Sequence, residues 1–236
     1  MNEPRKKIRI AIIDSGINQK LSNLKNNVIL STGFEIDRYG YIKENSDIPV
    51  RNLHGTIIAM IIRHICSDVE FVSVNILDEN LLTDGRILAY ALSRIFDYQP
   101  DMIHMSLGTL KKRYIIPLKK IVREAKKYNI QLVAAAEITG KISYPAHLKG
   151  VFGVKADLFD DCTRYSYQNS FFYAPSDTYG IECIQAISDV STASGTSMSA
   201  AYMSGHIANI LKNNHNISYK NVKEALLQKM KEESII

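Results

Sequence analysis

The sequence predicts an α/β fold of three layers, in which a doubly wound and mostly parallel β-sheet carries helices on both faces. Two observations lead to this expectation. Short, continuously apolar runs, typical of strands buried on both faces, alternate with amphipathic segments typical of helices. The chain has 236 residues, of which 46% are hydrophobic and 22% charged, which is enough for one substantial core. Because no repeat, low-complexity segment or linker interrupts the pattern, we expect residues 1–236 to form a single domain.

The first two thirds of the chain supply the alternating elements in order. A continuous apolar run ends at Asp14, and a polar, turn-rich stretch separates it from a buried helix that begins at His54. Thr83 suits the N-cap of a second helix, and Pro117 suits the first turn of a third. We predict strands at 8–13, 28–30, 71–77, 102–107 and 130–136, and helices at 54–65, 83–98 and 117–128.

The pattern changes after residue 143. Short strand-like segments dominate at 151–156, 164–175 and 180–187, and they predict an antiparallel β region. A run of small residues then leads into an apolar-periodic helix that begins near Ser197 and reaches about Leu211. A final amphipathic helix is expected at about 219–230.

Composition argues against several classes of function. The net charge of +5 is mild, and the basic clusters at 5–7 and 111–113 lack interleaved aromatic residues, so we expect no nucleic-acid partner. Cys66, Cys162 and Cys183 are widely spaced and predict neither disulfides nor a zinc site. No calcium-site motif is present either, so we expect no metal and no cofactor. Since neither a signal peptide nor a membrane span is evident, we expect a cytoplasmic protein that binds no membrane; the oligomeric state is left open.

Ser197 is the first candidate for chemistry. It lies at the start of a predicted helix, where unpaired N–H groups and the helix dipole favour negative charge. Taken alone, it is best interpreted as an N-cap, because serine is a favoured capping residue. Asp14 at a strand end and His54 at a helix start have equally ordinary interpretations. On those interpretations the chain would be an unrelated α/β protein.

Taken together, the three residues resemble the motifs of one family. Residues 14–16 read Asp-Ser-Gly, residues 54–56 read His-Gly-Thr, and residues 195–199 read Gly-Thr-Ser-Met-Ser. These segments resemble the D-S/T-G, H-G-T and G-T-S-M-A/S motifs of the subtilisin-like serine proteases, or subtilases, which order their triad Asp, His, Ser. The resemblance extends from about residue 8 to residue 211 and implies the subtilisin-like form of the α/β fold.

The resemblance implies a role for each of these side chains. A serine hydroxyl is a poor nucleophile unless a base accepts its proton and an anion orients that base. Ser197 is therefore the expected nucleophile, His54 the general base and then acid, and Asp14 the carboxylate that fixes the imidazole tautomer. The other histidines match no motif; we interpret His104, which stands where the family usually has Asn, as a packed strand residue.

Substrate-binding residues also follow from the resemblance. In the family an S-L-G segment pairs with the substrate backbone and forms one wall of the primary specificity pocket, while a V-A-A-A segment forms the opposite wall. Such pairing takes affinity from main-chain hydrogen bonds and selectivity from pockets. The matching residues are Ser106, Leu107 and Gly108 for the first wall, and Ala134, Ala135 and Ala136 for the second.

One departure from the family pattern concerns the oxyanion hole. The family's V-A-A-A-G-N ends in an Asn that donates to the oxyanion, and Ile138 stands at that place without a donor. In subtilisin the loss of this donor lowers kcat by about 10²–10³. The Ser197 N–H and the Thr196 hydroxyl remain, and Thr139 would substitute if the loop shifted by one residue. An ionised Glu137 would repel an oxyanion, so we expect it to point away.

These features predict a slow, selective serine endopeptidase that processes a peptide or precursor protein. The alternative is a pseudoprotease that binds peptides without efficient turnover; Ile138 favours it, and the retained triad argues against it. Because the matching alanines and Gly108 have little bulk, the pocket is expected to accept small or medium side chains. The mild positive charge suits an acidic substrate segment.

Overall fold

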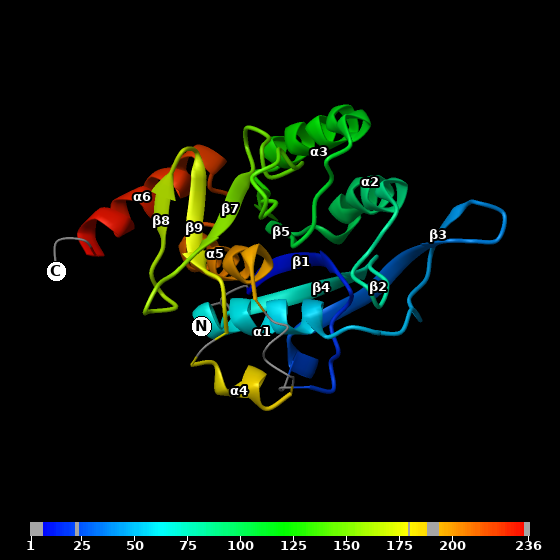
Figure 1. The fold of residues 1–236 in the computed structure, drawn as a ribbon, viewed down its shortest axis with the longest axis horizontal. Helices are drawn as coiled ribbons and strands as arrows, with labels where there is room; N and C mark the ends of the chain where they lie inside the picture. Colours follow the sequence, from blue (N-terminus) through cyan, green and yellow to red (C-terminus); the bar gives the residue numbers. More distant parts are fainter. Residues whose placement is uncertain (1–6, 22–23, 179, 188–193, 234–236) are drawn as a thin grey trace, which may run out of the picture.

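The computed structural model describes residues 7–21, 24–178, 180–187 and 194–233, and a nine-stranded β-sheet forms its centre (Figure 1). The strands are β1 (Ile8–Asp14), β2 (Val28–Ile36), β3 (Ile42–Glu44), β4 (Val69–Asn75), β5 (Met102–Met105), β6 (Gln131–Ala135), β7 (Phe152–Asp157), β8 (Ser166–Gln168) and β9 (Phe171–Pro175). Their order is β3-β2-β4-β1-β5-β6-β7-β9-β8. Among the strands that the structure describes, only the edge strands β3 and β8 pair antiparallel, so the prediction of a mostly parallel sheet is confirmed.

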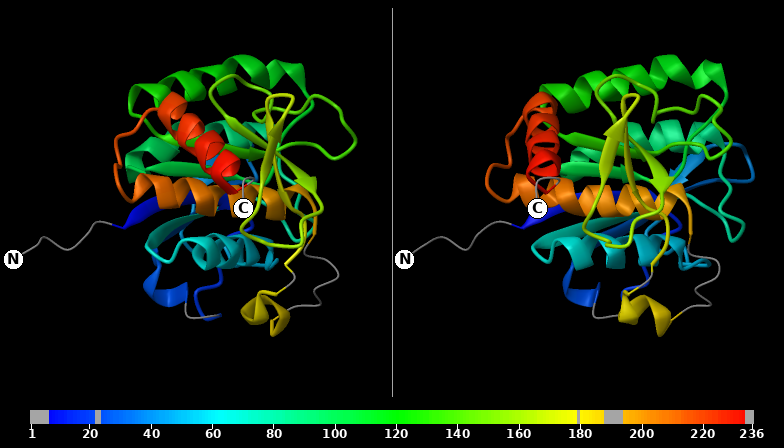
Figure 2. Two further views of the ribbon diagram at one scale, coloured as in Figure 1. Left: turned by 90° about the vertical axis from the view of Figure 1, so that its left-hand side faces the viewer. Right: turned by 60° about the vertical axis from the view of Figure 1, so that its left-hand side comes forward.

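Helices cover both faces of this sheet. They are α1 (His54–Ile65), α2 (Gly85–Arg94), α3 (Ile115–Lys127), α4 (Glu182–Gln185), α5 (Thr196–Leu211) and α6 (Tyr219–Glu233), with short 3-10 turns at Leu24–Asn26, Ile95–Tyr98 and Lys112–Tyr114. Figure 2 shows α2 and α3 on one side of the sheet, and α1 and α5 on the other. The three-layer α/β prediction is therefore confirmed. Among the described residues, no helix is both long and apolar enough to cross a membrane.

Alternation along β1 explains why two cores form. Ile8, Ile10 and Ile12 join the cluster beneath α1 and α5, whereas Ala11 and Ile13 join the cluster beneath α2 and α3. Successive side chains of a strand point to opposite faces, so an all-apolar strand supplies both layers.

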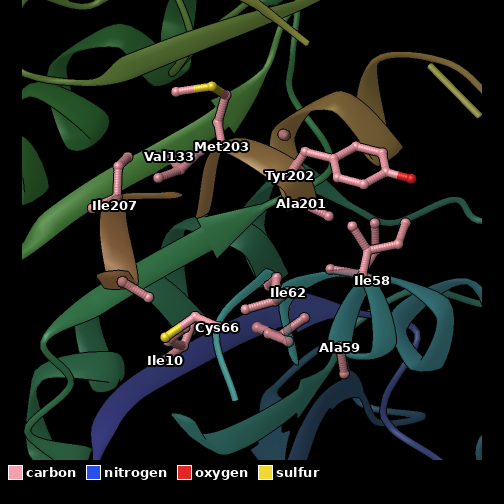
Figure 3. Packing of buried hydrophobic residues seen from close by; sticks show 14 of the residues in the cluster. Ile10, Ile58, Ala59, Ile62, Cys66, Val133, Ala201, Tyr202, Met203 and Ile207 are labelled. Carbon is pink, nitrogen blue, oxygen red and sulfur yellow. The ribbon is translucent and has the colours of Figure 1, made fainter. Parts of the chain in front are cut away.

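The helices α1 and α5 pack closely in the first of these layers. Figure 3 shows Ala201 and Tyr202 of α5 facing Ile58 of α1. A Cβ at Gly205 would lie 2.5 Å from Cβ of Ile65, so the close approach of the two helices requires a glycine there. This contact fixes the position of the helix that carries Ser197.

Several boundaries differ from the sequence prediction. Asp84, not Thr83, caps α2, because its carboxylate accepts the Arg86 N–H. The segment predicted as a strand at 180–187 instead contains the short helix α4: Ile181 and Ile184 are both buried, and their spacing is that of a helix. The antiparallel prediction after residue 143 was wrong for β7 and β9, which pair parallel because β8 supplies the return path at the sheet edge.

The strand order places a crevice at the end of β1. This strand lies between β4 and β5, so the chain adds strands first on one side of β1 and then on the other. Doubly wound sheets bind ligands at the carboxyl ends of strands where the order reverses in this way. Asp14 is the last residue of β1 and is therefore at the end of the strand where such a site is expected.

Candidate active site

Asp14 and His54 form a hydrogen-bonded pair. Asp14 is fully buried, and its Oδ1 lies 2.8 Å from Nδ1 of His54 and accepts the Ser15 N–H at 2.8 Å. Burial disfavours the charged carboxylate, but the charge and hydrogen bond of His54, together with Ser15, hold the pKa of Asp14 below its usual value. Burial likewise opposes protonation of His54, but Asp14 raises the pKa of the imidazole above its usual value. The pair therefore joins an ionised carboxylate to an imidazole whose protonated form that carboxylate favours.

Two glycines interlock the segments that carry this pair. A Cβ at Gly55 would lie 2.6 Å from the carbonyl oxygen of Gly16 and 3.1 Å from Cβ of Asp14. Gly16 itself has φ +85°, which L side chains rarely adopt. The Asp-Ser-Gly turn and the His-Gly-Thr helix start can therefore approach only because both carry a glycine.

Polar side chains that the sequence did not indicate complete this interlock. The Asn52 side chain accepts the His54 N–H at 2.8 Å, and the Ser15 hydroxyl accepts the Gly55 N–H at 3.1 Å while donating to the Asn52 carbonyl at 2.9 Å. Ser15 is part of the Asp-Ser-Gly motif, and its place next to Asp14 was the only feature of the sequence that could have indicated its role in the site. Asn52 lies just before His54 in a polar loop and carried none.

Ser197 is the second residue of α5 and does not cap the helix. The N-cap is Gly195, at φ +107°, and no side chain makes a capping bond there. The Ser197 hydroxyl instead donates to the Ser106 carbonyl at 3.3 Å. Within the described part of the chain, no hydrogen bond joins Ser197 to His54. Its oxygen is thus not used by the helix, and its N–H lies in the first turn, where such groups have no acceptor within the helix.

A cavity of about 270 Å³ is lined by Thr196, which directly precedes Ser197, and by Ser106, whose carbonyl accepts the Ser197 hydroxyl. Its walls include most of the residues predicted to bind substrate, together with Thr196: Ser106, Leu107, Gly108, Ala135 and Ala136. Ala134 is the exception, since it is fully buried within β6 between Met105 and Gly153 and belongs to the core beneath α2 and α3. Ala134 lies before the carboxyl end of β6, so only the two later alanines, Ala135 and Ala136, line the cavity.

The loop after β6 forms the rim of the cavity. Ile138 lines it and is 74% exposed, and its Cδ1 would lie 3.5 Å from a Cβ placed on Gly195. Thr139 is not among the lining residues, because both its N–H and its hydroxyl donate to the Glu137 carboxylate. These bonds from Thr139 lower the pKa of Glu137. Glu137 itself lines the cavity, so the expectation that its charge points away is not confirmed. Directly after Ala136 the loop therefore brings an acidic residue, Glu137, and an apolar one, Ile138, to the cavity mouth in place of the family's donor.

A second histidine lies close to the pair. His104 in β5 is fully buried, which fits its interpretation as a packed strand residue. Both ring nitrogens, however, lie 2.8 Å from serine hydroxyls, those of Ser204 and Ser106. No motif indicated these bonds, since Ser106 directly follows β5 whereas Ser204 comes from the distant helix α5.

The described residues hold no group of three or more His, Cys, Asp or Glu side chains placed to bind a metal ion. The chemistry that the arrangement supports uses a buried carboxylate, an imidazole whose pKa that carboxylate raises, and a serine that directly follows a residue of the cavity wall. This combination suits nucleophilic attack on a carbonyl with general-base assistance.

Comparison with known proteins agrees with this chemistry. The family model described as the subtilase family matches residues 5–235. The chain is similar to the major intracellular serine protease of Bacillus subtilis (strain 168), with 26% identity over 221 residues, covering 86% of this chain and 68% of that protein. In structure it is similar to Sphericase, with a TM-score of 0.68 and 20% identity over 94% of this chain and 82% of that one. A cold adapted subtilisin-like serine proteinase gives a TM-score of 0.67 and 18% identity over 91% and 79%.

Proposed function

The chain belongs to the subtilase family and is a serine-type endopeptidase, and on that premise we propose that Asp14, His54 and Ser197 are its catalytic triad. The observation that carries this assignment is the 2.8 Å bond between buried Asp14 and Nδ1 of His54. This bond fixes the tautomer that leaves Nε2 free to accept a proton. The family model spans 5–235, which supports a single catalytic domain for residues 1–236.

In the proposed reaction the Ser197 hydroxyl turns from the Ser106 carbonyl to Nε2 of His54 when substrate binds. His54 accepts the proton as Ser197 attacks the scissile carbonyl, and then returns it to the leaving amine. The Ser197 N–H and the Thr196 hydroxyl are the proposed oxyanion donors. Ile138 adds no third donor, so we expect slow turnover.

The proposed substrate is a peptide or an unfolded segment of a precursor protein. Leu107, Ala135, Ala136 and Ile138 give the cavity an apolar lining, and its volume of about 270 Å³ fits a small or medium side chain. Sequencing of cleavage sites checks this, and sites dominated by large aromatic residues would contradict it.

We further propose a dedicated processing role in the cytoplasm. A slow enzyme is efficient only on a substrate whose remote contacts position the scissile bond, and such binding raises kcat. The name of the Bacillus relative, an intracellular protease, supports the location. Removal of an acidic leader from a peptide precursor would fit this role and the net charge of +5.

The decisive experiment compares the protein with Ser197→Ala. Both are incubated with a peptide library and with lysate of the source cell, and new N-termini are labelled and identified. We expect one or a few cleaved precursors with the unaltered protein and none with Ser197→Ala. Equal cleavage by both proteins would refute the triad, and broad cleavage of many unfolded proteins would refute the dedicated role.

A further inference from the structure

His104 lies at the point where the sheet, the nucleophile helix and the cavity wall meet. Its neighbours across the strands are Ile12 of β1 and Val133 of β6. Met102 belongs to the core beneath α5, whereas Ile103 and Met105 belong to the opposite core, so alternation turns His104 toward α5. The ring is fully buried there.

The two ring nitrogens bind two different elements of the site. Nδ1 lies 2.8 Å from the hydroxyl of Ser204, a buried residue of α5 two helical turns after Ser197 and on the same face. Nε2 lies 2.8 Å from the hydroxyl of Ser106, which lines the cavity. The backbone carbonyl of Ser106 accepts the Ser197 hydroxyl. One imidazole therefore connects the helix that carries the nucleophile to the residue that holds its hydroxyl.

Neutral imidazole suits this connection. One of its nitrogens donates and the other accepts, and each serine hydroxyl can do either, so both bonds are satisfied in either tautomer. Burial lowers the pKa of His104 to about 4; the charge of Asp14 opposes this and that of His54 adds to it. The ring therefore stays neutral at the pH values at which His54 acts as a base.

We propose that His104 is a positioning residue, which acts through Ser106 to fix the place from which the Ser197 hydroxyl turns toward His54 and to hold the cavity wall during attack. This inference rests on the proposed function, because it assigns Ser197 as the nucleophile. The bond from Nε2 to Ser106 governs the rate of attack, whereas the bond from Nδ1 to Ser204 serves the stability of the fold.

Two substitutions of His104 separate these bonds. The amide of asparagine occupies roughly the place of Nδ1 and still reaches Ser204, but not Ser106. The amide of glutamine occupies roughly the place of Nε2 and still reaches Ser106, but not Ser204. Ser204→Ala and Ser106→Ala remove the corresponding partners. All four variants lose a buried hydrogen bond, so thermal unfolding measures the structural cost of each.

Inactivation by a serine-directed fluorophosphonate is the readout, since its saturation kinetics separate the rate of attack, kinact, from binding. We expect His104→Asn and Ser106→Ala to lower kinact about 10-fold, because a misplaced reacting group is costly to rate. His104→Gln and Ser204→Ala should stay within about 3-fold of the unaltered protein, at a similar loss of melting temperature. The double variant His104→Asn/Ser106→Ala should be no slower than either single change, because both act through one bond.

The other outcomes overturn the inference. If the four variants are slowed in proportion to their loss of melting temperature, or not slowed at all, His104 is a packed strand residue only. If the unaltered protein does not react at Ser197, the proposed function fails and this inference fails with it. Reaction of the unaltered protein and of all four variants at one rate would leave the proposed function standing and refute the role of His104 alone.

Discussion

The Asp14–His54 half of the candidate site is interlocked by packing, whereas the half around Ile138 is held by hydrogen bonds within its own loop. In the first half a single methyl group on Gly55 would collide with the backbone of Gly16. In the second, Gly140 has nothing within 4 Å of the place where a Cβ would stand, and Ile138 is 74% exposed. The difference teaches where the loss of the family's Asn is tolerated: Ile138 lies where few neighbours constrain the side chain, whereas the other departure, His104, is fully buried and bonded at both ring nitrogens.

The largest effect that we expect comes from Asp14→Asn, which leaves the shape of the interlocked half intact and removes its charge. Asp14 fixes the tautomer of His54 and stabilises its protonated form, so kcat should fall about 10⁴-fold. Asp14 also raises the pKa of His54, and the base is the neutral ring. The acid limb of kcat/KM should therefore move to lower pH in the variant. A pH–rate profile measures both effects; an unmoved limb would contradict the pairing.

Alanine substitutions at Gly55 and at Gly140 compare the two halves of the site directly. Gly55→Ala forces Cβ to within 2.6 Å of a backbone oxygen and should lower the free energy of unfolding by about 2–3 kcal/mol, with a loss of activity. Gly140→Ala meets no atom and should cost about 1–2 kcal/mol, because φ there is +80°, with activity retained. Urea unfolding measures the stability of the two variants, and peptidase assays measure their activity. Equal loss of activity in both would show that the loop is as constrained as the motif.

Ile138→Asn tests whether the unconstrained half can regain the donor that it lacks. We expect kcat to rise about 10-fold, less than the 10²–10³ that such a donor supplies where it is preorganised, because this side chain is mostly exposed. Ile138→Ala is the matched control, since it removes the apolar side chain from the cavity mouth without adding a donor. If both variants speed turnover equally, steric obstruction and not the missing donor slows the enzyme.

The contrast between local patterns and long-range packing also explains how much of the fold and of the site could be predicted from the sequence. The α1 boundaries were predicted at both ends, because His54 and the apolar run behind it obey local rules. The short helix α4 was missed, because its four residues are too few to show a helical period, and a short apolar segment such as 180–187 fits a strand equally well in the sequence. Within the site, motifs located the residues of the Asp14–His54 pair. The bonds of His104 depend on the packing of α5 over β5, which no local pattern encodes.

The smallest effect concerns Thr139, which we expected to replace the missing donor if the loop shifted. Its hydroxyl donates to Glu137 and does not line the cavity, so Thr139→Val should change kcat less than about 2-fold. Thr196→Val is the matched change at a residue that does line the cavity, and there kcat should fall several-fold, by roughly the loss of one weak oxyanion donor. Steady-state kinetics on one peptide substrate rank the two variants. If Thr139→Val proves the slower, the loop rearranges when substrate binds, Thr139 leaves Glu137 for the oxyanion, and the exposed half of the site is assembled only during the reaction.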